Sequence, residues 1–211
     1  GVAPARVLVL GGGVVGLNAA RMAMGLGAEV VVLERSIPRM AYIDEVTNGR
    51  VITRYSSIGA VEEEMVKADV IIGAVLVPGA EAPKLIKREH LTQMKPGSVL
   101  VDISIDQGGC FETSEITSHE HPIFMKYGVI HYCVPNIPSG FSRTASQAIS
   151  NVLMPLLLEA GEEGGFENLV WHKLHLRNGI YLFKGALTNF YLSQRFDLKY
   201  TDLNLLIASQ R

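Results

Sequence analysis

The stretch VLVLGGGVVGLNAARMAMGLGAEVVVLER, residues 7–35, decides how the chain folds. The apolar run at 6–10 predicts a strand, glycines interrupt it, and apolar residues at helical spacing over 14–26 predict a helix. A second apolar run at 29–33 has the length of a strand. Residues 1–34 therefore predict one βαβ unit, whose crossover should be right-handed.

The alternation of strand and helix continues along the chain. We expect further strands at 50–56, 69–75, 98–104 and 128–136, and short helices at 61–68 and 88–94. Strands this continuously apolar are typical of parallel sheets that are covered by helices on both faces. The pattern therefore predicts an α/β fold, a doubly wound parallel sheet of the Rossmann type.

The composition changes after about Asn136. A long helix is expected over 139–160, and the glycines that follow it should end it. The segment beyond consists of shorter amphipathic pieces, and it is too short to form a hydrophobic core of its own. We expect a nucleotide-binding domain at 1–138 and a long connecting helix with a hinge at 139–165. The helical segment at 166–211 should belong to an incomplete second domain.

Three glycines lie between the first strand and the first helix at the spacing G-x-G-x-x-G. Gly11 permits a tight turn, Gly13 lets the backbone approach a pyrophosphate, and Gly16 brings helix and strand close together. The first helical turn, with Val14 and Val15, offers unpaired N–H groups and the positive end of the helix dipole. The motif therefore predicts a dinucleotide site.

An acidic residue, Glu34, stands at the end of the second strand, where it can hydrogen-bond ribose hydroxyls. Its charge repels a 2′-phosphate, which favours NAD over NADP. Arg35 follows at once and is the kind of residue that accommodates NADP. We give more weight to Glu34 and interpret Arg35 as a solvated surface charge.

Composition excludes several other classes of function. The net charge is −2, and no basic run is long enough to indicate nucleic-acid binding. The apolar stretches are shorter than the roughly 20 residues that span a bilayer, and a signal peptide is not recognisable. The two cysteines form neither a disulfide framework nor a metal-binding cluster. We expect a cytoplasmic protein with no metal site.

Four later stretches make the sequence specific. They are GAVLVPGAEAPKLI (73–86), VLVDISIDQGGCFE (99–112), HYCVPNIP (131–138) and YLFKGALTN (181–189). Together with the glycine segment, they resemble the alanine dehydrogenase and pyridine-nucleotide transhydrogenase family in the right order over nearly the whole chain. IDQGG favours the dehydrogenase branch, since transhydrogenases tend to have a glutamate before QGG.

The resemblance implies reversible oxidative deamination of L-alanine to pyruvate and ammonia, with NAD as the cofactor. It places Glu34 on the adenosine ribose, Arg39 close to the adenosine end and Ser56 beside the adenine. The family usually has Asp at the position of Glu34. The resemblance also implies that the following residues line the rest of the cofactor cleft: Val75, Leu76, Ile103 to Asp106, Val134, Asn136 and Ile137.

Asp106 is the candidate catalytic residue. A carboxylate after a parallel strand lies at the carboxyl edge of the sheet, where it could orient the substrate amine or a water for proton transfer. The alternative is that Asp106 only accepts N–H bonds from the turn 107–109. Pattern alone leaves both open, and the resemblance favours the catalytic role. Asp102, inside the strand, should be structural.

Other chemically capable side chains are weaker candidates. His131 lies in an apolar strand and should be a structural histidine. His119 and His121 have no third ligand near them in sequence and indicate a solvated loop. Nothing near Cys110 in sequence would activate its thiol. The carboxylates at 62–64 are interpreted as an exposed helix face.

The family's substrate-binding Arg, Lys and His lie in a domain N-terminal to the nucleotide domain, and this chain begins at the nucleotide domain. We therefore expect a part that is catalytically incomplete by itself, in a homo-oligomer, with a hexamer implied by the resemblance. The alternatives are a non-catalytic NAD(H)-binding module and a transhydrogenase-type domain that passes hydride to another subunit.

Overall fold

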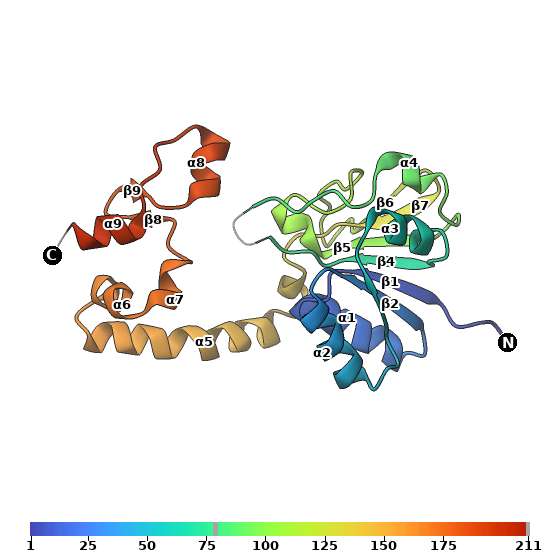
Figure 1. Ribbon diagram of the computed structural model, residues 1–211, viewed down its shortest axis with the longest axis horizontal. Coiled ribbons are helices and arrows are strands. Elements are labelled where there is room, and N and C mark those ends of the chain that lie inside the picture. The colour runs from blue at the N-terminus through green and yellow to red at the C-terminus, as the bar shows by residue number, and fades with distance from the viewer. Residues whose placement is uncertain (78–79, 210–211) are drawn as a thin grey trace. The chain divides into compact units, whose positions relative to one another are not determined.

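The computed structural model describes residues 1–77 and 80–209 (Figure 1). The chain divides into two compact units, residues 1–137 and 138–211. In the first unit a seven-stranded sheet has the order β3-β2-β1-β4-β5-β7-β6. Six neighbouring strands are parallel, and only β6 runs antiparallel to its neighbour β7. The expected α/β fold of the Rossmann type is confirmed.

The strands of this sheet are short. They are β1 (Arg6–Leu10), β2 (Glu29–Glu34), β3 (Ile52–Tyr55), β4 (Val70–Gly73), β5 (Val99–Asp102), β6 (Ile123–Lys126) and β7 (Val129–Tyr132). Between them lie α1 (Val14–Gly25), α2 (Ile37–Thr47), α3 (Ile58–Met65), α4 (Arg88–Leu91) and the 3₁₀ turn η1 (Ile103–Gln107). The sequence pattern did not predict α2, η1 and β6, and the remaining elements of the first unit lie where expected, with ends shifted by a few residues.

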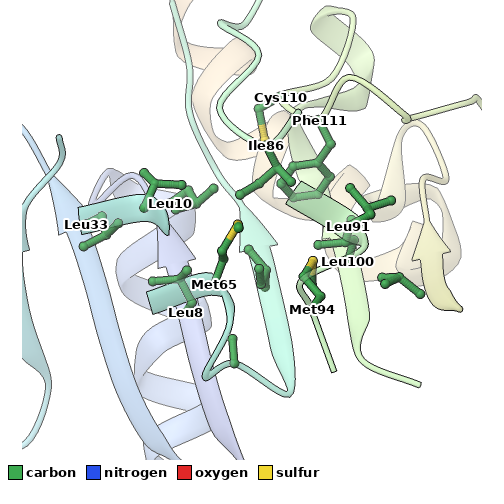
Figure 2. Packing of buried hydrophobic residues seen from close by; sticks show 14 of the residues in the cluster. Leu8, Leu10, Leu33, Met65, Ile86, Leu91, Met94, Leu100, Cys110 and Phe111 are labelled. Carbon is green, nitrogen blue, oxygen red and sulfur yellow. The ribbon is translucent and has the colours of Figure 1, made fainter. Parts of the chain in front are cut away.

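The two faces of the sheet bury alternate residues of the same strand. Leu8 and Leu10 of β1 pack into one cluster with Met65 of α3 (Figure 2), whereas Val7 and Val9 pack into a second cluster on the opposite face. Leu17 of α1 and Ile43 of α2 belong to the second cluster. Burying a side chain of this size contributes about 1.5–3 kcal/mol. Helices on both faces therefore explain why the strands are apolar without a break.

Glu64 of α3 is buried, which corrects the expectation that 62–64 form an exposed face. Its side chain is 5% exposed and pairs with Arg6 at 2.8 Å and Arg54 at 2.5 Å. Burial opposes the charge of Glu64, but hydrogen bonds from Arg6, Arg54 and Lys67 outweigh it and hold the pKa of this carboxyl below its ordinary value. The carboxylate thus ties α3 to β1 and β3.

His131 of β7 is a structural residue, as expected. It is fully buried, and its Nε2 lies 2.8 Å from the hydroxyl of Thr113 while its Nδ1 lies 3.1 Å from the carbonyl oxygen of Val129. The ring stacks on Phe124 of β6 with 4.7 Å between centroids. Burial lowers the pKa of His131, so the folded state holds it neutral.

The second unit is mostly helical. It contains α5 (Ser142–Glu162), α6 (Phe166–His172), α7 (Leu174–Arg177), α8 (Phe190–Phe196), α9 (Leu203–Ala208) and the hairpin β8 (Leu182–Phe183) with β9 (Ala186–Leu187). The turn η2 (Ile137–Phe141) precedes α5. Its core is small, with Val170, Phe183, Leu203 and Ile207 at the centre. Along α5 six large apolar side chains stay 49–66% exposed: Ile149, Val152, Leu153, Met154, Leu157 and Leu158.

Within the described residues, no helix combines the length and the apolar character needed to cross a membrane.

Replacing Glu64 by Gln should lower the free energy of unfolding by about 1–3 kcal/mol, because Arg6 and Arg54 lose their buried counter-charge. Glu63→Gln is the matched control, since the Glu63 side chain is 62% exposed and should contribute below about 0.5 kcal/mol. Urea unfolding of both variants measures this. Equal effects would contradict the structural role of Glu64.

His131 should make the first unit less stable in acid. Above about pH 6.5 the imidazole is neutral in both the folded and the unfolded chain, so burying it carries no cost of losing a proton. Below that, the unfolded chain binds a proton that the folded chain refuses, so stability falls until pH reaches the lowered pKa of the folded state. The urea concentration at the unfolding midpoint should fall between pH 8 and pH 5, and His131→Asn should make this fall smaller. The control variant His121→Asn, which replaces an exposed histidine, should show the same fall as the unaltered chain.

Candidate functional site: a glycine loop and the carboxyl edge of the sheet

The loop between β1 and α1 is shaped by two glycines that tolerate no side chain. A Cβ atom at Gly16 would lie 1.8 Å from the carbonyl oxygen of Gly11, and one at Gly11 would lie 2.8 Å from that of Ala74. Gly11 also has φ +95°, in the region that favours glycine. These contacts bring α1 against the strands. The loop geometry therefore needs glycine at both positions.

Gly13 differs, because a Cβ atom there would meet nothing within 4 Å. Protein packing does not explain the glycine, whereas close approach of a ligand to the backbone would. Gly13 is the N-cap of α1 and makes no side-chain cap, and Val14 and Val15 beside it are exposed. The N–H groups of this first turn and the helix dipole form an anion site. The chain thus fits a pyrophosphate here.

The carboxylate of Glu34 holds the same loop. One oxygen accepts the backbone N–H of Gly12 at 2.7 Å, and the other accepts those of Arg35 at 2.7 Å and Ser36 at 2.9 Å. A carboxylate has about four acceptor positions, so one remains for a ribose hydroxyl. Glu34 also has a structural role that the sequence did not indicate, because its carboxylate joins the end of β2 to the glycine loop.

Arg39 approaches the loop from α2. Its Nε donates to the carbonyl oxygen of Gly12 at 2.5 Å, and its guanidinium lies 4.9 Å from the centre of the Tyr42 ring. The helix is placed for this contact by Ser36, whose hydroxyl caps its N-terminus by accepting the N–H of Arg39. Arg39 therefore brings a positive charge to the rim of the glycine loop.

A pocket of about 140 Å³ lies at the carboxyl ends of β4 and β5. It is lined by Val15, Ala74, Val75, Leu76, Ile103, Ser104, Asp106 and Gln107. Five of these residues, Val15, Val75, Leu76, Ile103 and Asp106, are predicted site residues, so the structure brings them together. Ser104 was not singled out from the sequence and was covered only by the range 103–106. Its hydroxyl donates to the carbonyl oxygen of Val75 at 2.8 Å, which joins the segment after β5 to the segment after β4.

Asp106 is exposed at this pocket. Its two oxygens accept the backbone N–H of Asn136 at 3.0 and 3.2 Å, and Asn136 has φ +49°. These bonds bring the loop after β7 to the loop after β5. The alternative considered for Asp106 was that it accepts N–H bonds from the turn 107–109, but the N–H groups of Gly108 and Gly109 donate instead to the carbonyl oxygens of Ile105 and Ser104, each at 3.0 Å. Asp106 therefore keeps acceptor capacity for a ligand.

Asp102 is fully buried and anchors the turn beyond Asp106. It accepts the N–H groups of Ser104 at 3.1 Å and Cys110 at 3.0 Å, and the hydroxyl of Ser114 at 2.5 Å. Lys84 adds bonds from its ammonium to the carbonyl oxygens of Gly108 and Gly109. The structural role expected for Asp102 agrees with this network, whereas sequence spacing could not indicate Lys84.

The other predicted residues lie apart from the 140 Å³ pocket. Ser56 lines a second, larger pocket and is joined to β2 through its N–H, which donates to the carbonyl oxygen of Glu34 at 2.9 Å. Val134 is buried after β7, and Ile137 is half-buried. In the described residues neither of these two lines the pocket that holds Asp106.

The cysteines offer no nucleophile. Cys110 and Cys133 are both buried, and burial is the main cause that raises the pKa of each thiol. A group of three or more His, Cys, Asp or Glu side chains that could hold a metal is absent from residues 1–77 and 80–209.

A glycine loop, an acid at the end of β2 and a pocket at the carboxyl edge of a doubly wound sheet define a Rossmann-type dinucleotide-binding domain. The family model for the alanine dehydrogenase/PNT C-terminal domain matches residues 1–190. The chain belongs to this family.

Individual relatives agree with the family assignment. The chain is 50% identical to an alanine dehydrogenase of Halomonas elongata and 44% identical to one of Mycolicibacterium smegmatis. Each match covers 99% of this chain and 56% of the relative, so the chain spans little more than half of either protein.

Solved structures give the same result. An L-alanine dehydrogenase matches with a TM-score of 0.83 and 40% identity, covering 93% of this chain and 54% of that one. A transhydrogenase from Sinorhizobium meliloti matches with a TM-score of 0.68 and 29% identity, covering 75% of this chain and 46% of that one. Family and fold together imply NAD as the cofactor.

Gly13→Ala should separate ligand binding from folding. The methyl group meets no protein atom, so the unfolding midpoint should change little, but it would enter the space of a pyrophosphate. We expect NADH affinity, measured by fluorescence titration, to fall about tenfold or more, equivalent to about 1.4 kcal/mol.

Gly25→Ala is the control, because Gly25 lies at the far end of α1 and also has open space around it. Wild-type affinity in Gly13→Ala would show that the pyrophosphate does not approach this glycine.

Proposed function

We propose that this chain is the NAD(H)-binding part of an alanine dehydrogenase. The assembled enzyme converts L-alanine, NAD⁺ and water to pyruvate, ammonium, NADH and a proton. The observation that carries the proposal is the 140 Å³ pocket, in which Asp106 lies beside the first turn of α1 in a chain 50% identical to a protein named alanine dehydrogenase. The bound dinucleotide supplies hydride transfer.

The residues have distinct roles in this proposal. Gly11, Gly13, Val14, Val15 and Gly16 hold the pyrophosphate at the N-terminus of α1. Glu34 uses its remaining acceptor position to bind a hydroxyl of the adenosine ribose. The adenosine end of the dinucleotide lies between Arg39 and Ser56. Val75, Leu76 and Ile103 line the nicotinamide end, with Val134, Asn136 and Ile137 on its other side.

Asp106 is the proposed catalytic residue. Its carboxylate is exposed and is held in place by the N–H of Asn136, so its oxygens can orient the substrate ammonium or a water. A positioned carboxylate of this kind can hold or accept a proton during formation and hydrolysis of the imino acid. The apolar side chains of Val75, Leu76 and Ile103 line the same pocket beside this carboxylate.

The proposal extends to the organisation of the chain. Residues 1–138 form the nucleotide domain, 139–165 connect it to a second domain, and 166–211 belong to that second domain, whose remaining part would bind the substrate carboxylate. The exposed apolar side chains of α5 support further packing partners. We propose a cytoplasmic homo-oligomer, with a hexamer as the family resemblance implies.

The second candidate is a transhydrogenase-type hydride-transfer domain, or a module that binds NAD(H) without turnover. The match to the Sinorhizobium meliloti transhydrogenase supports it. Higher identity to the alanine dehydrogenases favours the first candidate.

The test joins this chain to the part of the Halomonas elongata relative that lies outside the match. The fusion should oxidise NADH when pyruvate and ammonium are added. Binding of NADH without turnover, in the fusion as in the chain alone, would favour the non-catalytic module.

Asp106→Asn in the same fusion should lower turnover by about 10²–10⁴-fold, because a positioned acid–base group is lost. Asp44→Asn is a matched control, since Asp44 is an exposed acid on α2 outside both pockets. Turnover and NADH affinity are measured on both variants. Turnover of Asp106→Asn within threefold of the control would assign the carboxylate a role in loop support alone.

A further inference from the structure

Two segments that are far apart in sequence are joined directly after Asp106. They are residues 82–86, which precede α4, and residues 107–112, which begin at the end of η1. Three backbone hydrogen bonds connect them, from the N–H of Ala82 to Gln107 at 3.0 Å, from Leu85 to Cys110 at 2.8 Å and from Glu112 to Ile86 at 2.9 Å. The segment before α4 thus supports the turn that follows Asp106.

Lys84 lies within this segment and reaches the same turn with its side chain. Its ammonium donates to the carbonyl oxygens of both Gly108 and Gly109, to the latter at 2.7 Å. Both glycines have positive φ angles, +85° and +76°, in the region that favours glycine. One cation therefore bridges two successive peptide groups in a left-handed turn.

The bridge fixes more than the two carbonyl groups. The N–H groups of Gly108 and Gly109 donate back to the carbonyl oxygens of Ile105 and Ser104 in η1, the turn that contains Asp106. The same two residues are therefore held on one side by η1 and on the other by Lys84. A shift of these peptide groups would pull on the backbone on which the Asp106 carboxylate stands.

A lysine is not needed merely to satisfy these carbonyl oxygens. Lys84 is exposed, and water can bond a carbonyl group at the surface. An ammonium held by two carbonyls makes charge-assisted bonds and sets the direction of both peptide groups, which a mobile water does not. Asp102 holds the segment from its buried side through the N–H groups of Ser104 and Cys110, and Lys84 holds it from its exposed side.

We propose that Lys84 is a positioning residue for Asp106. Its ammonium fixes the turn at Gly108 and Gly109, which keeps the Asp106 carboxylate in the direction that a substrate ammonium or a water requires. Lys84 does not line the 140 Å³ pocket, so it acts through the backbone and not by touching the reacting groups. The inference rests on the proposed catalytic role of Asp106.

The first test measures amide hydrogen exchange in the 211-residue chain. Lys84→Met removes the ammonium and keeps an unbranched apolar side chain. We expect the N–H groups of Gly109 and Asn136 to exchange about tenfold faster, because Gly109 loses its bridge and the N–H of Asn136 is bonded to Asp106. Lys84→Arg should restore slow exchange, since a guanidinium can also donate to two carbonyls.

Lys87→Met is the matched control. Lys87 lines the same larger pocket as Lys84 and is also exposed, but its ammonium lies 3.7 Å from a carboxylate oxygen of Glu89 instead of bridging the turn. Exchange at Gly109 and Asn136 should therefore stay unchanged in this variant. Equal exchange at Asn136 in Lys84→Met and Lys87→Met would overturn the inference.

The second test uses the fusion with the Halomonas elongata segment. Lys84→Met should lower kcat by about 10–100-fold, because the carboxylate is misplaced, and Lys84→Arg should recover most of it. The dissociation constant of NADH should stay within about threefold, since ground-state binding is not altered. A loss of stability alone would lower the urea midpoint and leave the kcat of the folded enzyme unchanged.

The two tests separate this inference from the proposed function. An active fusion in which Lys84→Met has the same kcat as Lys87→Met would overturn the inference and leave the proposed function intact. A fusion that binds NADH without turnover would contradict the proposed function. In that case, faster exchange at Asn136 in Lys84→Met would still show that Lys84 fixes the Asp106 carboxylate, and unchanged exchange would overturn that as well.

Discussion

The close approach of Gly16 to the carbonyl of Gly11 is the constraint on which the dinucleotide site depends. No other residue type fits at either position, because a single Cβ atom would collide with backbone that cannot move away. The contact sets where α1 begins, and at that end Gly13 makes no side-chain cap and has open space beside its Cα atom. The chemistry of the site follows from this packing, since a helix N-terminus is an anion site only if an anionic ligand can approach its N–H groups.

Around this contact the structure uses charged groups to join strand ends that are distant in sequence. Glu34 connects β2 to the glycine loop, Arg39 connects α2 to it, and Asp106 connects the loop after β5 to the one after β7. Each bond pairs a charged side chain with a backbone group, which gives strong and directional contacts. The carboxyl edge of the sheet is thus assembled before any ligand binds, so less ordering is required on binding.

Much of the fold could be predicted because its signals are local. The apolar run of β1, the glycine spacing and the end of β2 at Glu34 all lie within 35 residues. For two of the elements that were missed, the structure gives a physical reason. Helix α2 buries fully only Ile43 and Thr47, too few for a clear helical period, and β6 is an edge strand whose Ile123 and Met125 stay exposed. The burial of Glu64 depends on Arg6 and Arg54, which local pattern cannot place beside it.

The amino-acid sequence by itself determined the βαβ order, the glycine loop and the candidate residues, because periodicity and backbone sterics act over a few residues. Only the tertiary structure decided which of those residues share a pocket. Val15 and Asp106 meet because parallel strands end at one edge, and the carboxylate of Glu34 turns to the loop because three N–H groups lie within its reach. Contacts between distant segments depend on how the strands pair, which no single stretch of sequence specifies.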